Sequence, residues 1–207
     1  MEQLQGILNM DNDTWLEETK LVGCHVTLIP LQRKHADALI HAASDGNLWE
    51  LWFTSVPSKN TINGYIEKAL NDHSLGKALP FTVVDNTTGD IIGSTRLCEM
   101  TPENDRVEIG YTWYAKRYQK TGVNTECKYL LLQHAFETLN VIATELRTHW
   151  HNHISRAAIA RLGAKQDGVL RNHKKDKDGF YRDTVVFSII DHEWPMVKHS
   201  LSYKMDR

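Results

Sequence analysis

The sequence predicts a single α/β domain built on a mixed, mostly antiparallel sheet of six to seven strands flanked by helices. Several stretches alternate apolar and polar residues with the period of a strand. Turn sequences at residues 86–90 and 176–179 separate two pairs of these stretches and indicate hairpins. Other segments repeat their apolar residues at helical spacing. A chain of 207 residues is of ordinary size for one domain, so no second domain is needed.

The strands are expected at residues 21–29, 80–85, 91–97, 107–113, 144–149, 164–173 and 181–190. Pro30 ends the first of them because proline lacks a backbone N–H. In the fourth, strict alternation places two sets of side chains on opposite faces, with Val107, Ile109, Tyr111 and Trp113 on one and Glu108, Gly110 and Thr112 on the other.

Helices are expected at residues 32–43, 61–75, 122–139, 154–162 and 192–201. The third is the longest, and its wide apolar arc predicts that it is largely buried. Residues 1–18 are expected to form a polar lead with a short helix at residues 13–18, and residues 19–207 to form the domain. The aromatic stretch at residues 48–53 has two interpretations: a loop packed on the core, or part of the wall of a substrate site.

Composition excludes several classes of function. The chain has 24 Lys and Arg against 26 Asp and Glu, so it lacks the basic field of a general nucleic-acid binder. No apolar run approaches the roughly 20 residues that span a bilayer. The N-terminus carries acidic residues where an export signal would carry basic ones. A cytoplasmic protein is therefore expected, with Cys24, Cys98 and Cys127 as reduced, buried thiols.

The most informative segment joins the fourth expected strand to the longest helix. Gly122 lies where that helix begins, so unpaired backbone N–H groups and the positive end of the helix dipole converge there. Lys116, Arg117 and Lys120 add local positive charge. Such a helix start is suited to binding a phosphate group, although the same residues are also compatible with an ordinary loop and helix cap.

Residues 119–124 and 152–164, taken together, resemble the GCN5-related N-acetyltransferases (GNAT superfamily). In that family a loop written Q/R-x-x-G-x-G/A holds the diphosphate of acetyl-CoA. Gln119 and Gly122 match it, whereas Asn124 departs from the usual Gly or Ala. The departure looks like the variant of the ribosomal-protein-alanine acetyltransferase (RimJ/RimL-like) branch. Asn152, followed by a helix that ends in Leu-Gly-Ala at Gly163, matches the second family segment, and a C-terminal glycine also has its own physical reason.

The resemblance implies a GNAT fold, with the sheet splayed between its fourth and fifth strands to admit acetyl-CoA as the co-substrate. It also implies a set of residues that contact acetyl-CoA, namely Thr112, Trp113, Tyr114, Gln119, Lys120, Thr121, Gly122, Val123, Asn124, Asn152 and Ser155. Because the expected mechanism is direct attack with no covalent enzyme intermediate, Cys127 is not a nucleophile.

Two residues are candidates for the chemical step. Glu108 resembles the catalytic Glu of the histone-acetylating members and is the candidate general base; the alternative is a strand residue with a cross-strand partner. Ser155 would protonate the departing thiolate, because Ile159 occupies the position where several relatives have Tyr. The alternative for Ser155 is a helix cap.

Three His residues alternate at positions 149, 151 and 153, which raises the possibility of a metal site. No Cys lies nearby and no carboxylate spacing completes a known site, so no metal is expected. We expect instead that one of these His residues, with His173, lines the acceptor pocket or moves a proton.

The expected activity is transfer of an acetyl group from acetyl-CoA to a primary amine, either a protein N-terminus or a small amine such as a polyamine or aminoglycoside. The expected partners are acetyl-CoA and the amine acceptor, with no nucleic acid and no membrane, and the protein is expected to be a monomer or a homodimer. The main alternative is an acyl-CoA-binding regulator that has lost catalysis, which Ile159 and Asn124 make conceivable.

Overall fold

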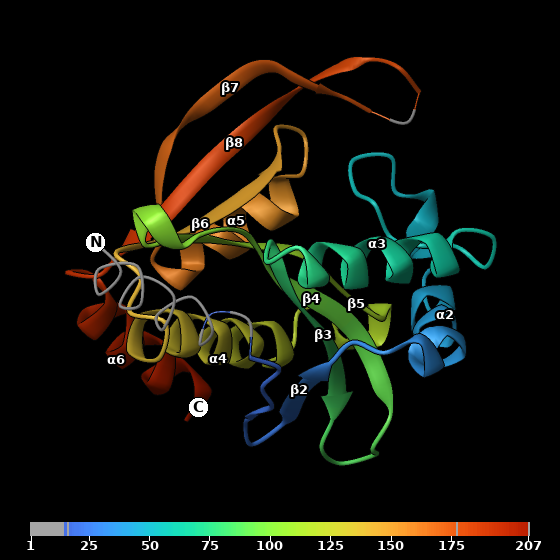
Figure 1. Cartoon of the computed structure of the whole chain (residues 1–207), viewed down its shortest axis with the longest axis horizontal. Coiled ribbons are helices and arrows are strands. Elements are labelled where there is room, and N and C mark those ends of the chain that lie inside the picture. The colour runs from blue at the N-terminus through green and yellow to red at the C-terminus, as the bar shows by residue number, and fades with distance from the viewer. Residues whose placement is uncertain (1–14, 16, 177, 207) are drawn as a thin grey trace, which may run out of the picture.

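A single twisted sheet with helices on both faces forms the centre of the molecule (Figure 1). The computed structural model describes Trp15, residues 17–176 and residues 178–206. Within these residues, eight strands lie in the order β1-β2-β3-β4-β5-β6-β8-β7. All neighbouring pairs are antiparallel except β5 and β6. The strands are β1 (Leu21–Val22), β2 (Val26–Pro30), β3 (Ala78–Asp85), β4 (Ile91–Thr101), β5 (Arg106–Tyr114), β6 (Ala143–His149), β7 (Lys165–Lys175) and β8 (Tyr181–Ile190).

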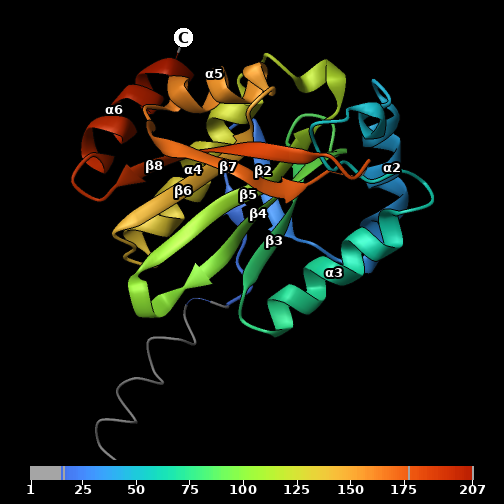
Figure 2. The ribbon, with the colours of Figure 1, turned by 90° about the horizontal axis from the view of Figure 1, so that it is seen from above.

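The helices lie on both sides of this sheet (Figure 2). They are α2 (Ala36–Ser44), α3 (Ile62–Ser74), α4 (Val123–Glu137), α5 (His153–Leu162) and α6 (Trp194–Met205), with 3-10 turns at Arg33–His35, Leu48–Glu50, Pro102–Asn104 and Lys116–Tyr118. One buried cluster joins α4, α5 and α6 to the sheet, and a second lies beneath α2 and α3. Because each face has its own core, the central strands are covered by helices on both sides, whereas β7 has no buried residue. None of the helices in the described ranges combines the length and apolar character of a membrane span.

The expected helices of the domain are all present, with ends that differ by a few residues, and the two predicted hairpin turns join β3 to β4 and β7 to β8. Helix α4 is largely buried, as predicted. The short helix expected in the lead is not found at residues 17 and 18, and the rest of that segment except Trp15 lies outside the described residues.

The sheet has one strand more than predicted because residues 21–29 form a hairpin rather than a single strand. The backbone N–H groups of residues 24–26 donate to the Glu126 carboxylate at 2.7–2.8 Å. Glu126 lies in α4, so this turn is held by a residue about 100 positions away in the chain. The turn leaves Cys24 exposed, and its predicted burial is therefore wrong; Cys98 and Cys127 are buried free thiols as expected.

Strand β5 contains a bulge that strict alternation did not predict. Tyr111 has a φ of +52°, and the register with β4 shifts at this point. An extra residue in a strand exchanges the faces of the residues that follow it. As a result, Thr112 faces α4 together with Ile109, whereas Trp113 packs beneath α2 and α3. The predicted placement of Trp113 with Ile109 is therefore wrong.

Strands β5 and β6 separate soon after they begin. Their pairing is limited to the three residue pairs that join Arg106 to Ala143, Val107 to Thr144 and Glu108 to Glu145. β5 then continues to Tyr114 and β6 to His149 with no further pairing between them. This confirms the predicted splay, which falls between the fourth and fifth strands when the two-residue β1 is left aside.

Candidate active site

The helix start at Gly122 has room for a ligand. Gly122 is the N-cap of α4 with an ordinary φ of −66°, and a Cβ added to it would meet no heavy atom within 4 Å. Neither backbone conformation nor packing therefore requires glycine here. The preceding Lys120 adopts a left-handed conformation with a φ of +61°, which is uncommon for a residue with a side chain. Since the first N–H groups of a helix lack intrahelical acceptors, this geometry fits a diphosphate.

Hydrogen bonds shape the loop before this helix start. The side-chain amide of Gln119 donates to the Tyr114 carbonyl oxygen at 3.0 Å and so ties the loop to the end of β5. The Thr121 hydroxyl donates to the Tyr118 carbonyl oxygen at 2.6 Å, and the Val123 N–H donates to that hydroxyl at 3.3 Å. Of the predicted contacts, Gln119 and Thr121 therefore already have structural roles in placing the loop.

The three cations expected near the helix start do not all serve it. The backbone N–H of Arg117 donates to the Asp45 carboxylate, and its guanidinium lies 3.8 Å from the same group. Lys116 packs closely against Gly46 in the loop after α2. Lys120 has no side-chain partner within the described part of the chain. Positive charge at the helix start therefore comes from the helix dipole and Lys120.

The edge of β5 that faces β6 is open beyond Glu108. On the opposite edge, Trp113 and Tyr114 pair with β4, and their side chains are buried in the two cores. An unpaired strand edge offers backbone N–H and C=O groups to an extended ligand. This arrangement suits the pantetheine arm expected at residues 112–114, through backbone contacts rather than through the aromatic side chains.

Glu108 lies where the two strands part, with its side chain 15% exposed. Burial raises the pKa of its carboxyl, and the guanidinium of Arg147, whose Nε lies 3.4 Å from Oε2, opposes that rise. Arg147 also pairs with Glu145, which in turn binds Arg106 at 2.6 Å. Glu108 thus has a cross-strand partner, Arg147, as the alternative interpretation expected, but its side chain is largely buried rather than solvent-facing. A carboxyl with a raised pKa is a suitable general base near neutral pH.

Asn152 and Ser155 lie at the beginning of α5, the helix that follows β6. The Asn152 side chain caps the helix by accepting the Ser155 backbone N–H at 3.0 Å. The cap alternative for the Ser155 hydroxyl is therefore wrong, because Asn152 has that role. Ile159 is buried in the core, and Gly163 ends the helix with a φ of +105°, as predicted.

Sequence reasoning missed two buried cations that flank β5. The Lys128 ammonium donates to the Thr112 hydroxyl at 2.6 Å, and burial lowers the pKa of Lys128 to about 8. On the other face, Arg96 is 1% exposed, with its guanidinium carbon 4.5 Å and 4.2 Å from the ring centres of Tyr65 and Tyr111. Arg96 therefore supports the bulge at Tyr111. The one available signal was a lysine within the apolar arc of a long helix.

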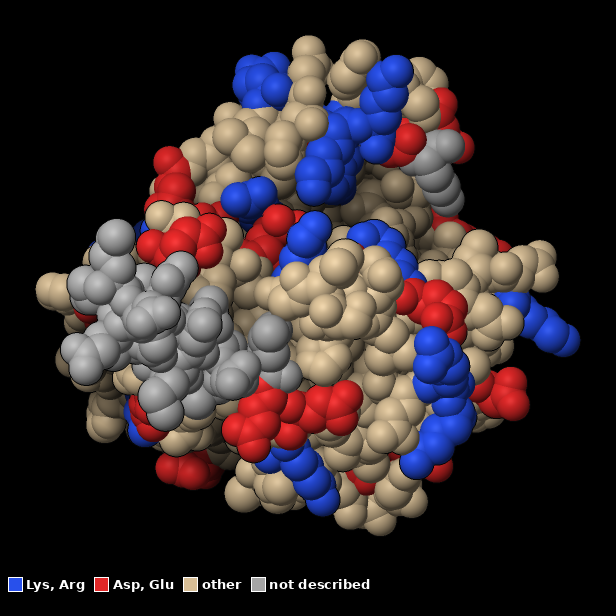
Figure 3. Space-filling view, viewed as in Figure 1, with Lys and Arg blue, Asp and Glu red and all other residues tan. Residues whose placement is uncertain are grey.

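A cavity of about 440 Å³ lies beneath the end of the β7–β8 hairpin, where the surface is hollowed in Figure 3. It is lined by Trp52, His149, Trp150, His151, Asp176, Asp178, Phe180, Tyr181, Arg182 and Asp183. Trp52 therefore belongs to a cavity wall, whereas Leu48 of the same aromatic stretch is buried in the core.

His149 is the most buried member of that lining, at 4% exposed, and its ring centre lies 4.9 Å from that of Trp52. Burial lowers the pKa of His149. His151 also lines the cavity, but His173 does not and instead contacts the Thr184 hydroxyl at 3.1 Å. Within the described residues, no group of three or more His, Cys, Asp or Glu side chains is arranged to hold a metal ion.

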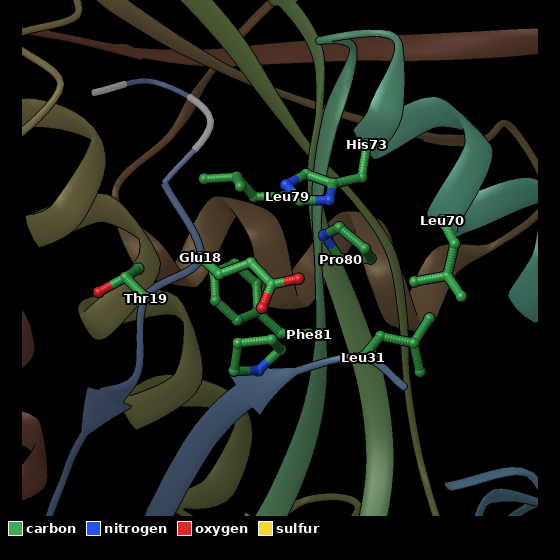
Figure 4. A pocket seen from close by; sticks show the side chains of 9 residues that line it. Glu18, Thr19, Leu31, Leu70, His73, Leu79, Pro80 and Phe81 are labelled. Atoms are coloured by element: carbon green, nitrogen blue, oxygen red, sulfur yellow. The ribbon is translucent and has the colours of Figure 1, made fainter. Parts of the chain in front are cut away.

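A second pocket, between α3, β3 and the chain before β1, is shown in Figure 4. Its volume is about 10 Å³, which is about the space of one water molecule. It is therefore too small for either substrate of an acetyl transfer.

Known proteins are similar to this chain in sequence and in fold. The family described as "Acetyltransferase (GNAT) domain" matches residues 25–165. The "Uncharacterized N-acetyltransferase p20" of Bacillus licheniformis is 28% identical over 82% of this chain and 94% of its own. The "Putative ribosomal N-acetyltransferase YdaF" of Bacillus subtilis is 30% identical over 51% of this chain and 57% of its own.

The RimJ protein of Mycobacterium smegmatis, solved in complex with CoA-disulfide, has the same fold with a TM-score of 0.75 at 21% identity. The match covers 92% of this chain and 96% of that one. The family match spans more than half of the chain and includes Glu108, the open edge of β5 and the helix start at Gly122. The chain therefore belongs to the GNAT acetyltransferases and is an N-acetyltransferase.

Proposed function

We propose that this enzyme acetylates the α-amino group of a polypeptide, with acetyl-CoA as the acetyl donor and Glu108 as the general base. The observation that carries the proposal is the position of Glu108, a largely buried carboxylate with a raised pKa at the point where β5 and β6 part. An amine nucleophile must lose a proton as it attacks a thioester, and a carboxylate held there is placed to accept it.

The residues around the splay have distinct tasks in this proposal. The helix start at residues 120–124 holds the diphosphate, and the backbone of residues 112–114 and Asn152 hold the pantetheine arm. The acceptor nitrogen forms a bond to the acetyl carbonyl carbon, and its proton passes to the Glu108 carboxylate. The carbon–sulfur bond then breaks, and the Ser155 hydroxyl, which has no hydrogen-bond partner within the described residues, supplies a proton to the thiolate. Ser155 regains a proton from solvent, to which Glu108 releases the proton of the amine.

Two observations support a polypeptide acceptor. A relative with 30% identity over half of the chain carries the word ribosomal in its name. In addition, Phe180 and Tyr181 project from the end of the hairpin with 72% and 63% of their surface exposed. Large exposed aromatic side chains beside a cavity are typical of surfaces that contact another macromolecule. The Asp residues of the cavity instead favour a polyamine, which is the second candidate acceptor.

The experiment that tests the proposal has two arms. Calorimetry with acetyl-CoA measures binding in the wild type and in Glu108→Gln. Release of free CoA thiol is then followed with a panel of N-terminally free peptides, N-terminally blocked peptides that contain lysine, and polyamines. The proposal requires micromolar binding in both proteins, and thiol release with free N-termini that Glu108→Gln slows by about 10²–10³-fold. Acetylation of polyamines alone would contradict the polypeptide acceptor, and binding without thiol release would identify a regulator.

A further inference from the structure

Glu108 of β5 and the cavity beneath the hairpin lie along the same face of the β5–β6 pair. Glu145, which pairs in register with Glu108, shares a face with Arg147 and His149, because side chains alternate along a strand. His149, at the end of β6, is part of the cavity lining. His149 lies four positions after Glu145, and four steps along a strand span about 13 Å. An extended acceptor that follows this face from Glu108 would reach the cavity with a part about 13 Å from its reacting amine.

The lining of the cavity has the chemistry of a cation site. It carries three carboxylates (Asp176, Asp178 and Asp183) against the single guanidinium of Arg182. Four aromatic side chains, Trp52, Trp150, Phe180 and Tyr181, form much of the rest. The face of an aromatic ring attracts cations, and more strongly when the ring also excludes water.

Two of these rings already bind cations of this chain. The guanidinium carbon of Arg156 lies 4.2 Å from the ring centre of Trp150, and the ammonium of Lys175 lies 5.1 Å from that of Tyr181. Trp52 and Phe180 have no such cation among the described residues. Neither ring therefore has a cation of the described chain over it, and Trp52 is positioned by the rings of Phe53, His149 and His151.

The three carboxylates also differ in whether they already have partners within the chain. Asp183 accepts from Arg171 and from the backbone N–H of Asn172, and Asp176 accepts two backbone N–H groups within the turn. The carboxylate of Asp178 has no partner within the described ranges. Lys and Arg side chains gather on the hairpin in Figure 3, whereas the cavity lining itself carries three carboxylates and one guanidinium.

His149 does not oppose a cation at the base of the cavity. Its Nδ1 accepts the His151 backbone N–H at 3.0 Å, which requires that this nitrogen carry no proton. Arg182 and His151 add to burial in lowering its pKa, so the ring is neutral at pH 7.

We infer that the acceptor carries a second positive charge about 13 Å from the amine that is acetylated, and that Trp52, Phe180 and Asp178 bind this charge. The inference rests on the proposed function, because it takes Glu108 as the place where the amine reacts. A basic side chain at about the fifth residue of an extended peptide supplies such a charge, because four steps of about 3.3 Å separate that residue from the N-terminal amine. The distal ammonium of a long polyamine supplies the same chemistry.

The test compares peptides that differ only at their fifth residue. We expect kcat/KM to be about tenfold higher with Lys than with Glu at that position. Asp178→Asn and Trp52→Ala should each reduce this preference severalfold, whereas Asp178→Lys should reverse it. Asp90→Asn, the same substitution in the turn between β3 and β4, is the matched control and should leave it unchanged. Equal rates with Lys and Glu, or a preference unaffected by Asp178→Asn and Trp52→Ala, would overturn the inference.

Two further measurements identify the source of the charge and separate the two proposals. If a polyamine is the acceptor, rates with α,ω-diamines of increasing length should rise to a maximum and exceed those with the peptides. If a polypeptide is the acceptor, the peptides should react faster than any diamine. Binding of N-acetylated product peptides, followed by tryptophan fluorescence with Trp52→Ala as control, reports on the cavity without any reaction. Absence of thiol release with every amine overturns the proposed function, whereas equal binding of the Lys and Glu products overturns the cavity assignment.

Discussion

The two ends of the candidate active site are built in different ways. The proposed cofactor end, residues 119–124, is one contiguous loop followed by the first turn of α4, and the ligand groups that we propose there are backbone N–H groups. The acceptor end combines Trp52, the end of β6 and the β7–β8 hairpin, and its groups are side chains. A local backbone site follows from local sequence, whereas a site assembled from distant side chains depends on the whole fold. We therefore expect substitutions at the two ends to have separable effects.

The largest expected effect separates chemistry from cofactor binding. Glu108→Gln should lower kcat by about 10²–10³-fold, because the amine loses its proton acceptor. Calorimetry should give an unchanged Kd for acetyl-CoA, since the cofactor end does not include Glu108. Glu103→Gln, a change of an exposed carboxylate just before β5, serves as the control. An unchanged kcat would show that another group is the base.

The second prediction concerns the stability of the fold around Lys128 in α4. Lys128→Met should raise the free energy of unfolding at pH 7 by about 2 kcal/mol, or about thirtyfold in the equilibrium constant, because the buried ammonium is removed. The folded-state pKa of about 8 lies below that of the unfolded chain, so the wild type gains stability relative to the variant as pH rises from 8 to about 10.5.

Urea denaturation at pH 7 and at pH 10 checks this expectation, with the exposed Lys68→Met as control. The stability gap should narrow at the higher pH. A gap of the same size at both pH values would mean that Lys128 contributes through packing rather than through its charge.

The third prediction breaks the cofactor end alone. Gly122→Ala should weaken acetyl-CoA binding about tenfold, or about 1.4 kcal/mol, because the new methyl group occupies space that the ligand needs. The melting temperature should barely change, since the φ of Gly122 is ordinary and no atom lies near the added Cβ. Gly64→Ala in α3 is likewise free of contacts and should leave binding unaltered. Equal affinity for acetyl-CoA in the wild type, Gly122→Ala and Gly64→Ala would show that the diphosphate does not bind at this helix start.

The smallest effect sharpens the role of charge at the reaction centre. Arg147→Met removes the cation that opposes the raised pKa of Glu108, so that pKa should rise further. Because the base must be ionised, activity should be lost at a higher pH as the solution is acidified. The loss of kcat/KM in the variant relative to the wild type should approach tenfold at acidic pH and disappear at alkaline pH. A pH–kcat/KM profile that does not move would exclude Glu108 as the titrating group.

The cofactor end and the acceptor end also differed in how far they could be predicted. The resemblance around Gln119 and Gly122 led to the family and to the splayed sheet, and both are confirmed. The individual contact residues stay predictions. The partnership of Glu108 with Arg147 could not be predicted, because the two residues lie 39 positions apart and meet only when β5 pairs with β6. The role of Trp52 was undecided for the same reason.

The bulge at Tyr111 shows the limit of alternation within one strand. The order of residues 107–113 is compatible with a regular strand, but pairing with β4 and the stacking of Arg96 on Tyr111 favour an extra residue. Buried Arg96 has no counterpart in the local pattern, since its environment is made by α3 and β5 together. Faces predicted from alternation are therefore reliable only up to Gly110.

The sequence by itself determined the class of the fold, the helices, the two hairpins and the family, because each depends on residues close together in the chain. Tertiary structure alone decided the bulge in β5, the burial of Lys128 and Arg96, and the partners of Glu108. It also decided the aromatic and acidic cavity that we assign to the acceptor. The physical reason is that periodicity, turns and capping act over a few residues, whereas burial and charge pairing depend on which distant segments the fold brings together.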